Sequence, residues 1–347
     1  MKATVRLESL GRFPGLRVLA WCSGSLFAGQ GYTLLRWDPQ NQAWLRVAAF
    51  HPAPWRRVTS AHFLSSRLFR DGFHALVQLP DSTLVAVLPK TIAVLPPGAS
   101  HFEATFHIPR GSRPLSLALA SNGKIFWGEY FDNPERDAVH IYGSEDGGRS
   151  WDIAYTFPPR SIRHIHGIFY DRYEDCLWVL TGDLDQECKF LRASPDFARV
   201  DQAFSGTQQT RAVTLLPFPE ALYFATDTPF EQNYVLRLRR DGELERLSSL
   251  ESSSFFGCAV GRALFFSTLV EPSPINLNSF ASLSGSLDGL NFSTLIRWPR
   301  DRWPLKFFQY PNIILPAGEN NSDMLALTGL AVRGESNVTH MFRVHFE

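Results

Sequence analysis

The chain has 347 residues, and its 34 Lys and Arg side chains balance its 34 Asp and Glu side chains. This balance argues against a protein that binds nucleic acid or an acidic membrane surface, because both partners call for an excess of positive charge. The 28 Phe and 9 Trp residues, with 24 Gly and 23 Pro, are typical of many short strands separated by turns. We therefore expect an all-β fold.

The sequence also bears on the cellular compartment. It has no apolar run of the length that a membrane span needs, and its first residues lack the apolar core of a secretory signal. Cys22, Cys176, Cys188 and Cys258 are scattered without a Cys-x-x-Cys pair, which favours buried free thiols. We expect a cytoplasmic monomer with no membrane or nucleic-acid partner.

Units of similar length follow one another along the chain, each about 40 to 50 residues long, the period expected for four short strands and their turns. The Arg-rich residues 52–70 show no periodicity and are interpreted as a loop inserted over one face. The last unit is one strand short, and we expect residues 3–7 to supply that strand beside residues 340–346 and so to remove an exposed sheet edge. The units cover residues 16–50, 73–108, 114–157, 163–204, 211–247, 255–296 and 306–346.

A turn motif lies near the end of the third unit, where residues 144–151 read Ser-Glu-Asp-Gly-Gly-Arg-Ser-Trp. Asp146 can cap backbone N–H groups, and the two glycines can adopt positive φ at low cost. Residues 194–197, 240–242 and 286–292 carry weaker forms of the motif in later units. The motif resembles the Asp box of sialidases and of the wider BNR-repeat β-propellers. This resemblance implies one propeller domain over residues 1–347, with seven four-stranded antiparallel blades, or six as the alternative, and with the Asp box on the face away from the active site.

Polar side chains gather where a propeller would bring them together. The start of each blade's first strand and the end of its second strand share one face beside the central channel, and the convergence of polar groups there is the main functional signal. The candidate catalytic residues are Glu129, His164, His166, Asp183, Asp227 and Glu271. The candidate substrate-binding residues are Tyr130, Arg163, Gln209, Arg211, Lys306, Gln309 and Tyr310.

His164 and His166 are two residues apart on an expected strand, so both should project from the same side. Three interpretations stay open. The pair can hydrogen-bond to neighbouring blades, it can act on the substrate as a general base or sugar contact, or it can bind a divalent metal with Glu129 or Gln309 completing the ligand set.

The whole chain resembles uncharacterised bacterial BNR/sialidase-like propellers through residues 128–131 (GEYF), 163–167 (RHIHG) and 181–183 (TGD). Such relatives are often found with polysaccharide genes, which implies a glycan ligand. Sialidase activity itself is not expected, because adjacent Glu129 and Tyr130 should point to opposite sides of a strand and the Phe/Tyr-Arg-Ile-Pro motif is missing. Our hypothesis is a glycoside hydrolase or lyase acting on a complex or acidic glycan. The alternative is a non-catalytic propeller that binds a glycan or a protein.

Overall fold

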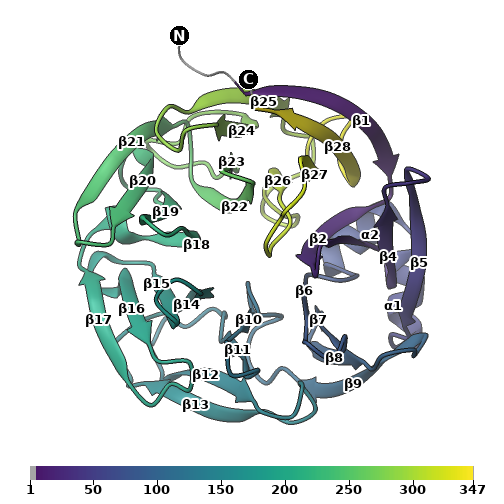
Figure 1. The fold of residues 1–347 in the computed structure, drawn as a ribbon, viewed down its shortest axis with the longest axis horizontal. Coiled ribbons are helices and arrows are strands. Elements are labelled where there is room, and N and C mark those ends of the chain that lie inside the picture. Colours follow the sequence, from purple (N-terminus) through teal and green to yellow (C-terminus); the bar gives the residue numbers. More distant parts are fainter. Residues whose placement is uncertain (1–4, 347) are drawn as a thin grey trace.

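The computed structural model describes residues 5–346, whose strands form a closed ring around a central axis, the position of the expected channel (Figure 1). Five sheets have four strands each, and a sixth has eight strands in two antiparallel halves that meet where β5 pairs briefly with β9. Counted as sheets, the described ring has six members, and counted as groups of four strands it has seven. The expected all-β fold with four-stranded antiparallel blades is confirmed.

Each group of four runs from the channel to the outside of the ring (Figure 1). The first three groups are β2 (Arg17–Cys22), β3 (Ser25–Gln30), β4 (Thr33–Asp38) and β5 (Ala43–Phe50); β6 (Ala75–Gln78), β7 (Leu84–Leu88), β8 (Thr91–Leu95) and β9 (His101–His107); and β10 (Ala118–Leu119), β11 (Ile125–Gly128), β12 (Val139–Ser144) and β13 (Asp152–Phe157).

The next three groups keep the same order in the chain, and the last one takes its outer strand from the N-terminal end. They are β14 (His164–Asp171), β15 (Cys176–Gly182), β16 (Lys189–Ala193) and β17 (Val200–Ser205); β18 (Ala212–Pro217), β19 (Ala221–Thr226), β20 (Asn233–Arg239) and β21 (Leu244–Leu250); β22 (Ser254–Val260), β23 (Ala263–Thr268), β24 (Phe280–Ser286) and β25 (Ser293–Pro299); and β26 (Asn312–Ile314), β27 (Met324–Leu330), β28 (Val338–His345) and β1 (Arg6–Pro14).

The hydrophobic core lies between neighbouring blades. The second strands β7 and β15 are buried along their whole length, because both faces of each pack against another sheet. The outer strand β13 leaves most of its side chains wholly or partly exposed. Between two neighbouring blades, Phe126, Ile165 and Val179 belong to one continuous apolar cluster. This packing fixes the inner strands, whose ends carry the polar residues of interest.

The ring closes through antiparallel pairing of β1 with β28, from Arg6 opposite His345 to Pro14 opposite Val338. Closure by an N-terminal strand is therefore confirmed, but the expected range of 3–7 is corrected, since the strand continues to Pro14. Residues 3 and 4 lie outside the described residues. The strand passes Gly11 through a bulge, and the Phe13 ring packs 5.4 Å from the Trp37 ring. This aromatic contact holds the second half of the strand in place.

Residues 52–70, expected to form a loop, contain two short helices, α1 (Pro54–Ser60) and α2 (Phe63–Phe69). Seven residues are too few to show a helical period in the sequence, although a proline at the first helical turn is a typical start signal. Arg56 Nη1 lies 2.6 Å from Asp71 Oδ1, and Arg67 Nη1 lies 2.6 Å from Asp301 Oδ2. The helices are thus tied to the ring. Within residues 5–346, no helix is long and apolar enough to cross a membrane.

The turn between β12 and β13 has the hydrogen bonds expected from its sequence. Asp146 Oδ1 accepts from the backbone N–H groups of Arg149 and Ser150, at 3.0 and 2.9 Å, and from the Ser144 hydroxyl at 2.9 Å. The Ser144 hydroxyl in turn accepts from the N–H of Gly148 at 2.8 Å. The motif therefore acts as a structural turn between the third and fourth strands of its blade.

Candidate functional site

Three neighbouring blades bring predicted site residues together on one face of the ring. Antiparallel pairing of β14 with β15, β18 with β19 and β22 with β23 puts the start of each first strand beside the end of the second. Asp183 and Asp227 directly follow β15 and β19, and Glu271 follows β23. Arg211, at the start of β18, contacts both Asp183 and Asp227. The expected common face is therefore observed for these residues.

His164, His166 and Asp183 form a compact buried group. His166 Nε2 lies 3.2 Å from both His164 Nε2 and Asp183 Oδ1, and His164 Nε2 lies 3.4 Å from the same oxygen. Burial lowers the pKa of His166 to about 4, although its hydrogen bond with Asp183 acts in the opposite direction. The two histidines meet as expected. The third potential metal ligand is Asp183, which corrects the expectation that Glu129 or Gln309 would complete the set.

Two arginines surround the carboxylate of Asp183. Arg163 Nη1 donates to Oδ2 at 3.0 Å, and Arg211 Nη2 lies 3.1 Å from Oδ1. Burial alone would raise the pKa of this carboxyl, but the hydrogen bonds to His164 and His166 and the charge of Arg211 hold it well below its usual range. Asp183 is therefore ionised at physiological pH.

Asp227 and Glu271 lie on the other side of Arg211 and behave differently. Asp227 is 2% exposed, and its Oδ2 lies 3.5 Å from Arg211 Nε. Burial raises the pKa of Asp227 well above its usual value, and the Glu271 and Asp183 carboxylates add to the effect while Arg211 opposes it. Burial likewise raises the pKa of Glu271. Within the described part of the chain, Asp227 Oδ1 and Glu271 Oε2 are buried without a hydrogen-bond partner. The site therefore combines one ionised carboxylate with two that retain protons more readily.

Tyr130 lies against the histidine pair, with its ring centroid 4.4 Å from that of His164. Burial raises the pKa of Tyr130 to about 12, and the carboxylates of Asp227 and Asp183 contribute. The phenol is therefore protonated at physiological pH and can act as a hydrogen-bond donor to a ligand.

Two other predicted residues point elsewhere. Glu129 is fully buried, forms an ion pair with Arg110 and accepts from the backbone N–H of His140 at 2.9 Å. The Gln209 amide donates to Glu231 Oε2 at 2.8 Å. Neither side chain contacts the group around Asp183. The catalytic role predicted for Glu129 and the substrate-binding role predicted for Gln209 therefore stay predictions.

Residues 306–310 were expected to begin a first strand, but that strand is β26 (Asn312–Ile314) and they lie in the preceding connection. The N–H groups of Phe307 and Phe308 both bond to the carbonyl of Pro304, which forms a turn. Lys306 is exposed over the Phe307 ring. Tyr310 lies near Glu271, because burial and then the charge of Glu271 raise the pKa of its phenol. Gln309 lines a separate cavity described below.

Two residues outside the predicted site set support the loop after β15. Gln208 donates its amide to the carbonyl of Asp183 at 3.1 Å and to Asp185 Oδ1 at 2.8 Å. Glu187 Oε2 accepts from the backbone N–H of Asp183 at 3.0 Å, while its other oxygen pairs with Arg136. No spacing in the sequence signals these contacts, because they connect loops of neighbouring blades.

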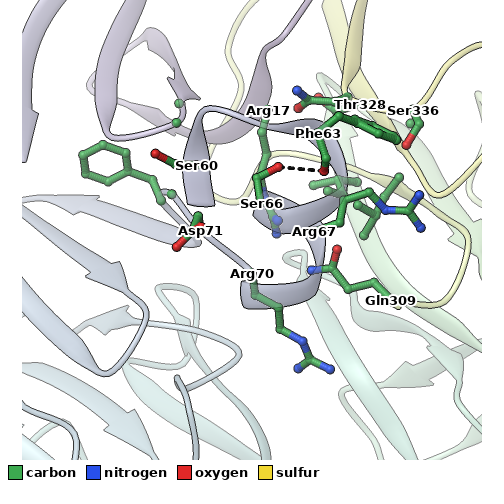
Figure 2. A pocket seen from close by; sticks show the side chains of 18 residues that line it. Arg17, Ser60, Phe63, Ser66, Arg67, Arg70, Asp71, Gln309, Thr328 and Ser336 are labelled. Atoms are coloured by element: carbon green, nitrogen blue, oxygen red, sulfur yellow. Dashed lines mark hydrogen bonds between the residues drawn. The ribbon is translucent and has the colours of Figure 1, made fainter. Parts of the chain in front are cut away.

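A second polar region lies between α2, β2 and the last blade (Figure 2). It encloses a cavity of about 100 Å³ lined in part by Arg17, Arg67, Arg70 and Gln309. Burial lowers the pKa of Arg17 to about 10. Burial and the nearby charges of Arg17 and Arg70 lower the pKa of Arg113 to about 9. Within residues 5–346, Arg17, Arg70 and Arg113 form no ion pair, so positive charge accumulates here.

Several solved structures are similar to this chain. The WD40 β-propeller domain of Doa1 has a TM-score of 0.57 at 10% identity, covering 98% of this chain and 97% of that one. A chain of the mitotic checkpoint complex has a TM-score of 0.58 at 10% identity, with coverages of 97% and 94%. The GH74 enzyme of Niastella koreensis has a TM-score of 0.54 at 14% identity, covering 83% of this chain and 46% of the enzyme. No protein-family model and no curated protein matches. At these identities the similarities establish the fold alone: the chain is a β-propeller.

Proposed function

We propose that the protein is a carbohydrate-active propeller that cleaves a glycosidic bond in a complex or acidic glycan, by hydrolysis or by elimination. The observation that carries the proposal is the arrangement of carboxyls around Arg211. Asp183 is held ionised, whereas the pKa values of Asp227 and Glu271 are raised by burial. Carboxyls whose pKa values are pushed apart in this way can divide the roles of base and acid.

The geometry is compatible with acid–base chemistry on a sugar. Asp183 and Asp227 both contact the guanidinium of Arg211, at 3.1 and 3.5 Å. Their contacting oxygens therefore lie within about 9 Å of each other, inside the upper limit for the carboxyl pair of a glycosidase. In hydrolysis by this proposal, Asp227 protonates the leaving oxygen and the ionised Asp183 stabilises the developing positive charge. The Asp227 carboxylate left behind then accepts a proton from the water that adds to the sugar.

The surrounding residues supply binding groups. Tyr130 can donate a hydrogen bond to a sugar hydroxyl, and Arg163 can bind a carboxylate of an acidic sugar next to Asp183. Arg17, Arg70 and Arg113, which form no ion pair among the described residues, favour an anionic ligand. The GH74 enzyme supports the proposal only as an analogy, because a fold does not determine a function.

A binding propeller without catalysis is the second candidate. The observation in its favour is the depth of the acidic group, since Asp227 is 2% exposed and the substrate would have to reach it through the channel mouth. Similarity to a WD40 domain is equally compatible with this role.

The test is product analysis after incubation of the full chain with neutral and uronate-containing oligosaccharides. Mass spectrometry separates hydrolysis from elimination, because elimination leaves an unsaturated product. We expect cleavage by the wild type and a loss of at least about 100-fold for Asp227→Asn, since a general acid contributes 10²–10⁴-fold. Asp241→Asn, in an exposed turn between outer strands, is the matched control. Binding without any cleavage across the panel would favour the second candidate and reject the first.

A further inference from the structure

We propose that His164, His166 and Asp183 bind one divalent transition-metal ion of the Zn²⁺ type. The proposal rests on the arrangement of these three side chains and does not depend on the proposed glycan chemistry. It develops one of the three interpretations of the histidine pair that the sequence leaves open, namely metal binding.

The hydrogen bonds of the two imidazoles fix where their lone pairs point. His164 Nδ1 lies 3.1 Å from the carbonyl of Phe131, and His166 Nδ1 lies 3.1 Å from the carbonyl of Ala212. A carbonyl can only accept, so each Nδ1 carries the proton. In the neutral rings both Nε2 atoms then present lone pairs close to Asp183 Oδ1. The hydrogen bonds to Asp183 described above therefore need an extra proton on the histidine pair, and a metal ion can take the place of that proton. Three electron-rich atoms meet at one point, and a cation between them would turn their mutual repulsion into attraction.

The spacing of the three atoms fits a metal ion. Tetrahedral zinc has bonds of about 2.0–2.1 Å, which places its ligand atoms about 3.3 Å from one another. The separations here are 3.2 Å between the two Nε2 atoms, and 3.2 and 3.4 Å from these nitrogens to Asp183 Oδ1. The side chains therefore need little rearrangement to bind a metal.

The surroundings have the features of a metal site beyond its direct ligands. Metal-binding histidines usually donate their second N–H to a carbonyl or carboxylate, as both do here. Arg163 donates to Asp183 Oδ2 at 3.0 Å and so turns Oδ1 toward the histidines. The absence of a side chain at Gly182 is also required, because a Cβ there would collide with the His166 ring.

The donor set indicates the class of metal. Two imidazole nitrogens with one carboxylate suit Zn²⁺ and related first-row ions, whereas Mg²⁺ and Ca²⁺ prefer oxygen ligands. Three protein ligands leave a coordination position for water or a ligand group, as in catalytic zinc sites. Arg211 Nη2, 3.1 Å from Asp183 Oδ1, borders that position.

A second group of potential ligands in the chain lacks these features. Asp171, Glu174 and Cys176 also lie close together. However, Asp171 accepts from Arg240 and from Trp178 Nε1, and Glu174 Oε1 lies 3.5 Å from Arg240 Nη1. This group contains no imidazole nitrogens, so it lacks the two facing lone pairs that His164 and His166 present.

The test is a calorimetric titration of the full chain with Zn²⁺ alone, after treatment with a chelator and removal of the chelator. We expect one Zn²⁺ per chain, a higher melting temperature with Zn²⁺, and no such response to Mg²⁺. His164→Asn and Asp183→Asn should weaken Zn²⁺ binding by at least about 100-fold, because loss of an outer-shell partner alone costs 10–100-fold. His140→Asn, which removes a histidine outside the group, should bind like the wild type.

Asp183→Asn keeps the shape of the side chain, so it remains informative if His164→Asn fails to fold. Binding of Co²⁺ to the wild type gives a second readout, since its visible absorption reports coordination by nitrogen and oxygen. A wild-type protein that ignores Zn²⁺ in molar excess would show that a shared proton, not a metal, occupies the group. Unchanged affinity in Asp183→Asn would equally overturn the proposal. Glycan cleavage is measured separately, so either proposal can fail alone.

Discussion

The two polar regions beside the channel differ in how their charges are balanced. On the acidic side, Arg211 is held between Asp183 and Asp227, within 3.1 and 3.5 Å. On the arginine side, Arg17 and Arg113 form no ion pair within residues 5–346, and burial lowers the pKa of both. The acidic side thus holds its cation between two carboxyls, whereas the arginine side is a set of cations without partners among the described residues. Removing a cation should therefore have opposite consequences on the two sides.

The largest expected effect comes from Arg211→Met. This change leaves buried carboxylates without their cation, and breaking a buried pair costs about 3–5 kcal/mol. The matched control is Arg17→Met, which removes a cation that has no anionic partner and should change the free energy of unfolding by less than about 1 kcal/mol. Urea denaturation measures both variants. Equal losses in both would show that the two sides do not differ as described.

A smaller effect, dependent on pH, is expected for Asp227→Asn. Because burial raises the pKa of Asp227, the folded state keeps a proton that the unfolded chain releases above about pH 4. The carboxyl therefore costs stability as the pH rises, and the amide does not carry this cost. The variant should be more stable than the wild type by about 1 kcal/mol or more at pH 8, with a much smaller difference at pH 4.

Thermal melting at both pH values measures this difference. A variant that is less stable than the wild type at pH 8 would indicate that the ion pair with Arg211 outweighs the burial of Asp227, and would place both carboxylates in one stable network.

The smallest effect on stability is expected for Arg113→Gln on the arginine side. Removal of one of several like charges should change the free energy of unfolding by no more than about 0.5–1 kcal/mol. We expect the variant to be slightly more stable than the wild type, because the remaining arginines repel one another less. The same change should slow association with polygalacturonate and reduce its dependence on salt, because unpaired cations steer anions. Surface plasmon resonance at two salt concentrations measures both quantities. An unchanged association rate would mean that these arginines do not face the ligand.

The fold was predicted from the resemblance of residues 144–151 to an Asp box and from the repeated units. The position of the acidic residues was predicted from where the strands end in a propeller blade. Asp183 and Asp227 come directly after buried strands, so their place at the channel follows from the ends of those strands. The direction of Glu129 could not be predicted, since its partner Arg110 lies in the connection before the blade. The aromatic residues 307–310 look like a strand, but Pro304 and Pro311 flank a turn instead. Sequence patterns locate strand ends well and loop contacts between blades poorly.

The arginine side could not be predicted from the sequence, because it too depends on contacts between separate parts of the chain. Arg17 begins β2, Arg70 ends α2 in a left-handed conformation, and Arg113 lies in the connection between β9 and β10. These positions are far apart in the chain and share no motif. Only the packing of α2 beside the last blade brings Arg17 and Arg70 to one cavity, where Gln309 joins them (Figure 2).

The pairing of β1 with β28 also has a consequence for synthesis on the ribosome. Residues 6–14 emerge more than 300 residues before their partner strand, residues 338–345. At about 5–20 residues per second, the first strand waits on the order of 20–60 s for its partner. During that time its edge is open to pairing with another nascent chain, so slow translation or dense polysomes should favour exchange of this strand between molecules. A chaperone that shields a single extended segment would be enough to prevent that exchange.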